Sequence, residues 1–153
     1  MIKVLFVCHG NICRSPMAEF VMKDLVEKAG IADRVYIASA ATSSEEIWRG
    51  VGNPVYPPAR AEMAKHGISC DGKTAVQMTK EDYEKYDLLI GMDGNNIRDM
   101  KRIAGGDPKG KIHKMTEYIG SNYDVADPWY TGNFKETWDD IYKSCQGLLK
   151  QLL

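Results

Sequence analysis

Short apolar runs alternate with longer amphipathic stretches along this chain, a pattern that predicts buried strands separated by helices. Runs with few polar positions are typical of strands that helices cover on both faces. The segments that predict strands are 3–8, 35–38, 87–92 and, more weakly, 111–115. The segments that predict helices are 16–29, 59–66, 79–86, 95–104 and 134–152. The stretch 41–58, rich in glycine and proline, is expected to be a loop.

The first and last predicted helices carry clear signals. From Phe134 to Leu152, apolar residues recur at spacings of four and three, which places them on one helical face. Ser15 suits an N-cap, Pro16 a first helical position and Gly30 the end of that helix. Strands that alternate with helices predict an α/β fold, a single doubly wound domain over residues 1–153 with a four-stranded parallel sheet flanked by helices. Ligands bind such sheets beyond the carboxyl ends of the strands, and the first strand ends at Cys8.

Composition and charge narrow the class of protein. The chain has 153 residues, of which 44% are hydrophobic and 27% charged, enough for one globular core. With 20 basic and 21 acidic residues the net charge is −1, so we expect neither nucleic acid nor a membrane surface as a partner. No apolar run reaches the length of a membrane span, and the N-terminus lacks the pattern of a signal peptide. Four cysteines without framework spacing predict free thiols in a reducing cytoplasm, and we expect a monomer.

The segment between the first strand and the first helix carries the candidate chemistry. Its sequence is Cys8-His9-Gly10-Asn11-Ile12-Cys13-Arg14-Ser15-Pro16. A loop that closes on a helix N-terminus turns its backbone N–H groups inward and forms a nest for an anion. Gly10 permits a tight turn, and Asn11 tolerates a left-handed backbone. Arg14 adds a planar fork of donors for a tetrahedral oxyanion, and this positive field stabilises a thiolate at Cys8. The loop therefore predicts a nucleophile held against a bound phosphate.

The same loop resembles the phosphate loop of the low-molecular-weight protein tyrosine phosphatases. Further segments follow the order of that family: Ser39-Ala40-Ala41-Thr42, Gly52-Asn53-Pro54, His66-Gly67-Ile68, Met92-Asp93 and Asp127-Pro128-Trp129-Tyr130. The resemblance covers nearly the whole chain. It implies hydrolysis of phosphotyrosine in proteins through a cysteinyl-phosphate, with tyrosine-phosphorylated proteins, phosphate and similar oxyanions as partners. It implies no cofactor and no metal, and no residue cluster here has metal-ligand spacing.

The resemblance assigns the catalytic roles. Cys8 would be the nucleophile, Arg14 the oxyanion clamp and Asp127 the general acid that later acts as a base. Taken alone, an aspartate before Pro128 is most often a turn residue, so the role of Asp127 depends on its pairing with the Cys8 loop. Asp124 is the nearest alternative acid.

Other residues are expected to bind the phosphate or to support the loop. The expected phosphate-binding residues beside Cys8 and Arg14 are His9, Gly10, Asn11, Ile12, Cys13 and Ser15. The resemblance implies that Ser39, His66 and Asp93 support the loop. Ser15 either caps the helix or donates to the Cys8 thiolate, and Asp93 either orients Arg14 or caps the helix that follows it.

The substrate pocket is expected to contain aromatic walls. Ile12, Trp48, Trp129 and Tyr130 are the candidates, and a deep slot would select phosphotyrosine over the shorter phosphoserine. Trp48 lies in a stretch that departs from the family pattern by an apparent insertion. Cys13 is either a small buried residue or the redox partner that captures oxidised Cys8 in a disulfide.

Three other functions remain open from the sequence. An arsenate reductase of the same fold relays a disulfide to a closely spaced cysteine pair, but Cys70 and Cys145 are far apart in sequence. A phosphoarginine phosphatase tends to carry Thr where Ile12 stands, and Ile12 suits a phenyl ring better. A phosphotyrosine-binding module usually loses the nucleophile or the acid, whereas this chain keeps both candidates.

Overall fold

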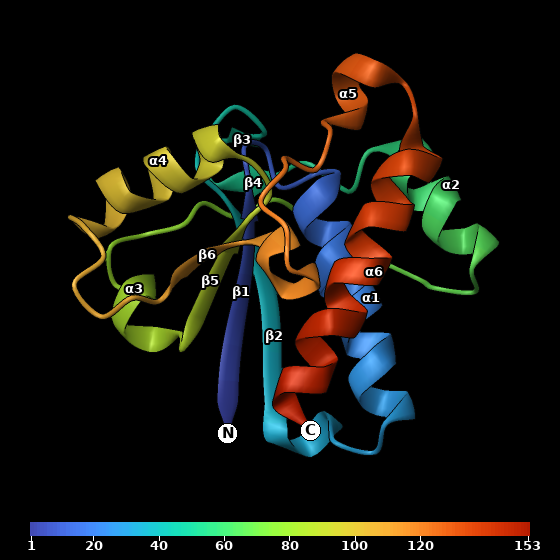
Figure 1. The fold of residues 1–153 in the computed structure, drawn as a ribbon. Coiled ribbons are helices and arrows are strands. Elements are labelled where there is room, and N and C mark those ends of the chain that lie inside the picture. Colours follow the sequence, from blue (N-terminus) through green and yellow to red (C-terminus); the bar gives the residue numbers. More distant parts are fainter.

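Four parallel strands run through the centre of the structure in the order β2-β1-β5-β6 (Figure 1). The computed structural model describes all residues, 1–153. The strands are β1 (Ile2–Cys8), β2 (Val35–Ala41), β5 (Leu88–Gly91) and β6 (Ile112–Lys114). This arrangement confirms the predicted α/β fold with a four-stranded parallel sheet. β2 continues three residues beyond the predicted end because Ala41 still pairs with Cys8 of β1.

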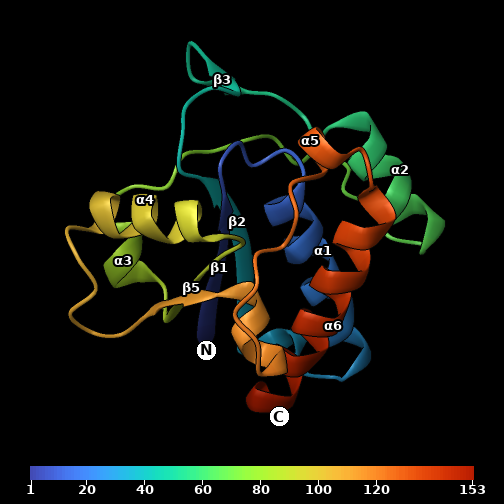
Figure 2. The same ribbon diagram turned by 45° about the horizontal axis from the view of Figure 1, so that its top comes forward.

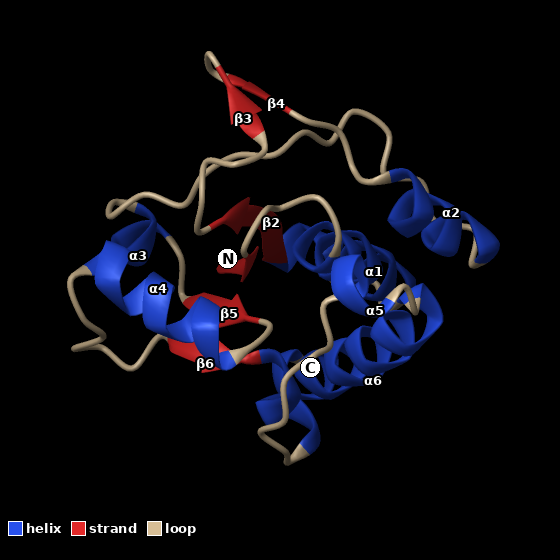
Figure 3. Ribbon diagram, turned by 90° about the horizontal axis from the view of Figure 1, so that it is seen from above, coloured by secondary structure: helices blue, strands red, loops and turns tan.

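Helices cover both faces of the sheet, as Figures 1 and 3 show. The helices α1 (Arg14–Lys28), α2 (Pro57–Lys65) and α6 (Phe134–Leu152) lie on one side, and α3 (Asp82–Lys85) and α4 (Gly94–Ala104) on the other. Side chains of β1 alternate between the two layers, since Val4 and Phe6 belong to the core under α1 and α6. Leu5 and Val7 belong to the smaller core that contains Met100 of α4. Both faces of β1 are therefore buried, which explains its unbroken apolar run.

The helix α6 has the predicted bounds. The stripe residues Trp138, Ile141, Cys145 and Leu148 are all buried. A Cβ at Gly147 would overlap the carbonyl of Tyr118, so the helix packs directly on the backbone of η2 (Met115–Ile119), a 3-10 turn after β6. Glycine at this position permits that close approach.

The N-terminus of α1 differs from the prediction. The helix begins at Arg14, with Cys13 as N-cap and no side-chain cap, so Ser15 lies inside the helix rather than at its cap. The helices α2 and α3 also begin at residues other than those predicted. α2 starts with Pro57 at its first position, two residues before the predicted start, and α3 is a single turn whose Asp82 carboxylate accepts from the N–H of Thr79.

The segment 41–58 is only partly a loop. It contains an antiparallel hairpin of β3 (Ile47–Trp48) and β4 (Val51–Gly52), which projects from the body of the molecule in Figure 2. Its two turn residues, Arg49 and Gly50, have φ of 48° and 79°. Positive φ at both central residues is the mark of a type I′ hairpin turn, for which Asn-Gly is the usual sequence signal, and arginine at the first position gives no such signal.

Two further elements stand outside the sheet layers: η1 (Ala32–Arg34) leads into β2, and α5 (Pro128–Thr131) follows Asp127. None of the helices combines the length and the hydrophobicity needed to cross a bilayer.

Candidate active site

The loop that carries Cys8 leaves the carboxyl end of β1 and ends at the N-terminus of α1. Asn11 has a φ of 58°, the left-handed conformation expected for it. Hydrogen bonds from neighbouring segments hold the outer side of the loop. The N–H of Thr42 donates to the carbonyl of Cys8 (2.9 Å), and the N–H of Tyr56 donates to the carbonyl of Ile12 (2.9 Å). The hydrogen bond from Tyr56 was not predicted, because it joins two backbone groups and no side chain indicates it in the sequence.

A cavity of about 150 Å³ opens over this loop. Residues of the loop, of the segment before the hairpin and of the segment 127–130 line it: Cys8, His9, Gly10, Ile12, Cys13, Arg14, Glu45, Glu46, Asp127, Trp129 and Tyr130. Three segments that are far apart in sequence therefore meet at one edge of the sheet. This is the edge at which parallel sheets bind ligands.

Arg14 is buried below the cavity and is fixed by two acceptors. Its Nη1 donates to Asp93 Oδ2 (2.8 Å) and to the carbonyl of Val125 (2.9 Å), while its Nη2 is 3.5 Å from Asp127 Oδ2. Burial opposes the positive charge of Arg14, but Cys8, Asp93 and Asp127 outweigh it and raise the pKa of the guanidinium. A charged guanidinium with a fixed plane is suited to bind two oxygens of a phosphate.

Asp93 performs both of the roles that the sequence left open. One oxygen accepts from Arg14, and the other accepts from the N–H of Asn96 (2.7 Å), which caps α4. The carboxylate thus links the strand end of β5 to the arginine.

The two oxygens of Asp127 also divide their roles. Oδ1 accepts from the N–H of Trp129 (3.0 Å), the turn contact expected of an aspartate before proline. Oδ2 lies near Arg14, and Asp127 lines the cavity. Asp124, the alternative acid, is instead bound to Lys114 (2.7 Å) and to the N–H of Gly94. The hydrogen bond from Lys114 lowers the pKa of Asp124, so this carboxyl is a poor proton donor near neutral pH.

A chain of buried hydrogen bonds leads from Cys8 to α1. Ser15 Oγ is 3.0 Å from Cys8 Sγ, and Asn11 Nδ2 donates to Ser15 Oγ (2.8 Å) and to Ser39 Oγ (2.9 Å). Ser39 Oγ donates in turn to Glu19 Oε1 (2.5 Å). Ser15 therefore contacts the thiol, and Ser39 supports Asn11.

The donor in each hydrogen bond of this chain follows from the groups that hold Asn11 and Ser39, namely Val76 and Glu19. The N–H of Val76 donates to Asn11 Oδ1 (3.1 Å), which leaves the Asn11 NH₂ group to donate to both serines. Glu19 contacts Lys23 (2.6 Å) and Lys73 (3.7 Å), and an ionised carboxylate can only accept. Each serine accepts from Asn11, so the hydroxyl hydrogen of Ser15 is directed either to Cys8 Sγ (3.0 Å) or to the carbonyl of Ala40 (3.4 Å), of which Cys8 is the nearer. A donor aimed at sulfur favours the thiolate.

Glu19, Lys73 and Val76 were missed by the sequence analysis. One signal in the sequence could have indicated Glu19: it is a carboxylate among the apolar residues of the segment Met17–Met22, and in α1 it is buried. Lys73 lies in an irregular segment, where its Nζ donates to the carbonyl of Ser39 (3.1 Å), and burial lowers its pKa against the opposing effect of Glu19. No local pattern indicates that contact.

The structure does not bring His66 to the loop. Its ring stacks on Trp138 at a centroid distance of 3.9 Å, and its Nε2 is 3.0 Å from a Glu62 carboxylate oxygen. The expectation that His66 supports the loop is therefore wrong, and the positions facing Asn11 and Ser39 are filled by Val76, Glu19 and Lys73. His66 instead lies at the end of α2, directly after its last residue.

The aromatic wall differs in one residue from the prediction. Trp129 and Tyr130 line the cavity, and the Trp129 ring packs against Tyr56 at 4.8 Å between centroids. Trp48 does not line it: its side chain is exposed on the hairpin, with the Arg49 guanidinium 5.5 Å from its ring. The inserted residues carry the indole away from the loop.

Two carboxylates occupy the rim on the hairpin side. Glu45 is 3.0 Å from His9 Nε2, and Glu46 accepts from Asn53 Nδ2 (2.7 Å) while packing over Gly10. His9 is half exposed at the rim.

All four cysteines are free and buried. Burial, followed by the charges of Cys8 and Asp127, raises the pKa of Cys13 to about 12. The Cys13 thiol is therefore protonated at neutral pH. The described residues hold no group of three or more His, Cys, Asp or Glu side chains arranged as metal ligands.

Comparison with known proteins identifies the family. The sequence profile described as low molecular weight phosphotyrosine protein phosphatase matches residues 3–153. The chain belongs to this family. Low molecular weight protein-tyrosine-phosphatase YfkJ of Bacillus subtilis is 38% identical, over 99% of this chain and 96% of that protein. The crystal structure of YfkJ has a TM-score of 0.93 to this structure and covers 99% of this chain and 94% of that chain.

Other relatives include a phosphatase of Gallus gallus and YwlE of Bacillus subtilis. The low molecular weight phosphotyrosine protein phosphatase of Gallus gallus is 39% identical, over 98% of this chain and 92% of that protein. The structure of a mutant of YwlE arginine phosphatase is 28% identical, with a TM-score of 0.85 over 99% of this chain and 95% of that chain. As a member of a family whose relatives are named protein-tyrosine phosphatases, the chain is a hydrolase.

Proposed function

We propose that the chain hydrolyses phosphotyrosine in proteins, with Cys8 as nucleophile, Arg14 as oxyanion clamp and Asp127 as general acid and base. The observation that carries this proposal is the cavity in which these three residues meet, although Asp127 comes from a segment far from the loop. The whole of residues 1–153 would form the catalytic domain. Membership in the phosphatase family supports the reaction type.

The first step forms a cysteinyl-phosphate. The Cys8 thiolate attacks phosphorus, the S–P bond forms and the P–O bond to the tyrosine breaks. Asp127, protonated, gives its proton to the leaving phenoxide. Arg14 and the N–H groups of the loop bind the three equatorial oxygens and stabilise their charge.

The second step releases phosphate. The Asp127 carboxylate takes a proton from water, the water oxygen attacks phosphorus, and the S–P bond breaks to restore the thiolate. A relative gives support for a phosphorylated nucleophile: the YwlE mutant is described as carrying a phosphorylated active-site serine.

The pocket walls support phosphotyrosine as substrate. Ile12 and Trp129 offer apolar surface beside the loop, and Tyr130 is exposed at the mouth. Two relatives named tyrosine phosphatases, at 38% and 39% identity, are also nearer in sequence than the arginine phosphatase YwlE at 28%. An arsenate reductase needs an exposed, closely spaced pair of cysteines. Cys70 and Cys145 are both buried and lie far apart in the sequence, so they do not form such a pair.

Cys13 is proposed to protect Cys8 from irreversible oxidation. Peroxide converts the Cys8 thiolate to a sulfenic acid, and Cys13 displaces water from that sulfur to form a disulfide. The charge of Cys8 contributes to the raised pKa of Cys13. That contribution disappears when Cys8 becomes the neutral sulfenic acid, so oxidation itself makes Cys13 easier to ionise. Free thiols throughout the chain also support a reducing compartment, the cytoplasm, and we propose that the enzyme acts as a monomer.

A comparison of substrates tests the proposal. Peptides of one sequence carrying phosphotyrosine, phosphoserine or phosphoarginine are hydrolysed side by side, with Cys8→Ser as the inactive control and arsenate with a thiol as the redox control. We expect the highest kcat/KM for phosphotyrosine and no turnover by Cys8→Ser. Faster hydrolysis of phosphoarginine, or arsenate reduction, would contradict the proposal.

A further inference from the structure

Two carboxylates line the cavity over Cys8 on the side of the hairpin. Glu45 and Glu46 belong to the segment between β2 and β3, and neither takes part in the reaction steps above. A phosphotyrosine brings about two negative charges into the cavity at neutral pH, and carboxylates at the mouth repel them. The charge of this rim is therefore opposite to the one that would favour phosphate alone.

The protein holds these carboxylates in place. At the start of the segment, Ser43 donates to the carbonyl of His9 through its N–H (3.1 Å) and through its hydroxyl (2.9 Å). At the end, Asn53 donates twice to Glu46, from its N–H to the carbonyl (2.8 Å) and from Nδ2 to Oε2 (2.7 Å). Asn53 directly follows β4, so the hairpin fixes the side chain of Glu46 at the rim.

No permanently charged basic side chain neutralises the pair. Of the residues that line the cavity, only Arg14 carries a permanent positive charge, and it is buried below the loop. Glu45 Oε2 is 3.0 Å from His9 Nε2, but His9 neutralises it only when protonated. The second oxygens of Glu45 and Glu46 have no partner in the protein. The guanidinium of Arg49, on the hairpin, lies over an indole ring instead.

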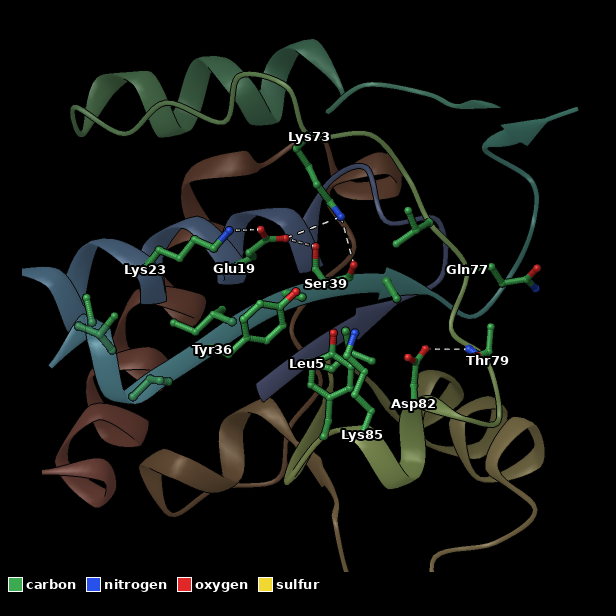
Figure 4. Close-up of a pocket in the computed structure, with 18 of the residues that line it drawn as sticks. Leu5, Glu19, Lys23, Tyr36, Ser39, Lys73, Gln77, Thr79, Asp82 and Lys85 are labelled. Carbon is green, nitrogen blue, oxygen red and sulfur yellow. Dashed lines mark hydrogen bonds and ion pairs between the residues drawn. The ribbon is translucent and has the colours of Figure 1, made fainter. Parts of the chain in front are cut away.

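A larger cavity, of about 640 Å³ along the outer edge of β2, shows a different pattern (Figure 4). There, Glu19 contacts both Lys23 (2.6 Å) and Lys73 (3.7 Å), so positive and negative side chains offset one another. A groove balanced in this way selects no charge in a ligand. The rim of Glu45 and Glu46 does, because its free oxygens leave negative charge beside the cavity.

We infer, given the proposed function, that Glu45 and Glu46 select phosphotyrosines that have a lysine or an arginine directly beside them in the substrate protein. With the phosphate on the loop and the tyrosine ring against Ile12 and Trp129, the peptide backbone crosses the mouth of the cavity. The side chain of the neighbouring residue then reaches the rim. An ammonium or guanidinium group there is attracted by the two carboxylates and offsets their repulsion of the phosphate.

Hydrolysis of matched peptides tests this selection. The probes are three peptides of one sequence in which both neighbours of the phosphotyrosine are lysine, alanine or glutamate. We expect kcat/KM to be about five- to tenfold higher for the lysine peptide than for the glutamate peptide, with alanine between them. The difference should lie in KM and not in kcat, because the neighbouring charge does not change during the reaction. It should shrink at high salt, which screens exposed charges.

Variants of the rim connect the preference to these carboxylates. Glu45→Gln and Glu46→Gln each remove one charge, and a glutamine oxygen at position 46 can still accept from Asn53. We expect each variant to narrow the ratio between the lysine and glutamate peptides about two- to threefold, and Glu45→Lys to reverse the preference. Glu27→Lys is the matched control, because Glu27 lies at the far end of α1 from the loop and outside the cavity. It should leave the ratio unchanged.

Two results would overturn the selection and leave the proposed function intact. In one, the wild type hydrolyses the three peptides equally well or prefers glutamate. In the other, Glu45→Gln raises kcat/KM equally for all three, which would mean that the rim only repels phosphate. Binding of the same peptides to Cys8→Ser keeps the two claims separate. Tighter binding of the lysine peptide without its hydrolysis by the wild type would support the selection and contradict the proposed reaction.

Discussion

At the scale of single residues, the nucleophile is prepared by partners that never contact the phosphate. Glu19 is two hydrogen-bonded residues away from Ser15: it accepts from Ser39, which in turn accepts from Asn11, and Asn11 donates to Ser15. An amide in place of Glu19 carries no charge, so Ser39 would lose its charged acceptor and would hold Asn11 less firmly.

Glu19→Gln is therefore expected to slow the alkylation of Cys8 by iodoacetamide at neutral pH about three- to tenfold, because a weaker hydrogen bond at Ser39 loosens Asn11 and, through it, the Ser15 hydroxyl beside Cys8. Asp24→Asn is the matched control, since Asp24 is also a carboxylate of α1 but pairs only with exposed Lys28. Equal alkylation rates in Glu19→Gln and in the wild type would show that the Glu19 carboxylate does not support the hydrogen bonds around Cys8.

At the scale of elements, short polar contacts place the ends of strands and helices. Asp107, in the loop between α4 and β6, links α3 to β6: its Oδ1 accepts from Tyr83 Oη (2.6 Å) and from the N–H of Lys111 (2.8 Å), and its Oδ2 accepts from the N–H of Ile112 (3.2 Å). Burial opposes ionisation of this carboxyl, but the hydrogen bonds outweigh it and lower its pKa.

Asp107→Asn should lower the free energy of unfolding at pH 7 by about 1–2 kcal/mol, because charge-assisted hydrogen bonds are lost. A carboxyl with a depressed pKa in the folded state stabilises it fully above the unfolded pKa, about 3.9, and loses this contribution as pH falls through the folded pKa. Urea unfolding at several pH values should show the difference between the two proteins shrinking below about pH 4. A difference that is the same at every pH would mean that ionised Asp107 is not the cause.

The elements themselves were largely predictable because their signals are local. Leu148 and Ile141 repeat at helical spacing, and Phe6 lies in an apolar run that only a buried strand tolerates. The hairpin at Arg49 was missed because its turn lacks the usual residues. Of the two roles left open for Ser15, the structure shows the contact with Cys8 and not the helix cap.

At the scale of the whole molecule, the site depends on contacts between segments that no local pattern reveals. Cys8, Arg14 and Asp127 could be proposed because each lies in a distinctive motif. Lys73 lies in none, so only the fold shows that it approaches Ser39. His66, in contrast, lies in a distinctive motif and was still misassigned. Its motif matched the family, but contacts with Trp138 and Glu62 hold its ring away from the loop.

The central claim is that the segment after Val125 brings a proton donor to the thiolate at the end of β1. The most direct test is the effect of Asp127→Asn on aryl phosphates whose phenols differ in acidity, measured in the first, burst step. The loss for phosphotyrosine should be about 10²–10⁴-fold and should shrink for an activated phenol, because a good leaving group departs without a proton. Phosphate binding should change little, since Arg14 and the loop N–H groups remain. Equal losses for good and poor leaving groups, or no loss at all, would contradict the account and leave Asp127 as a turn residue only.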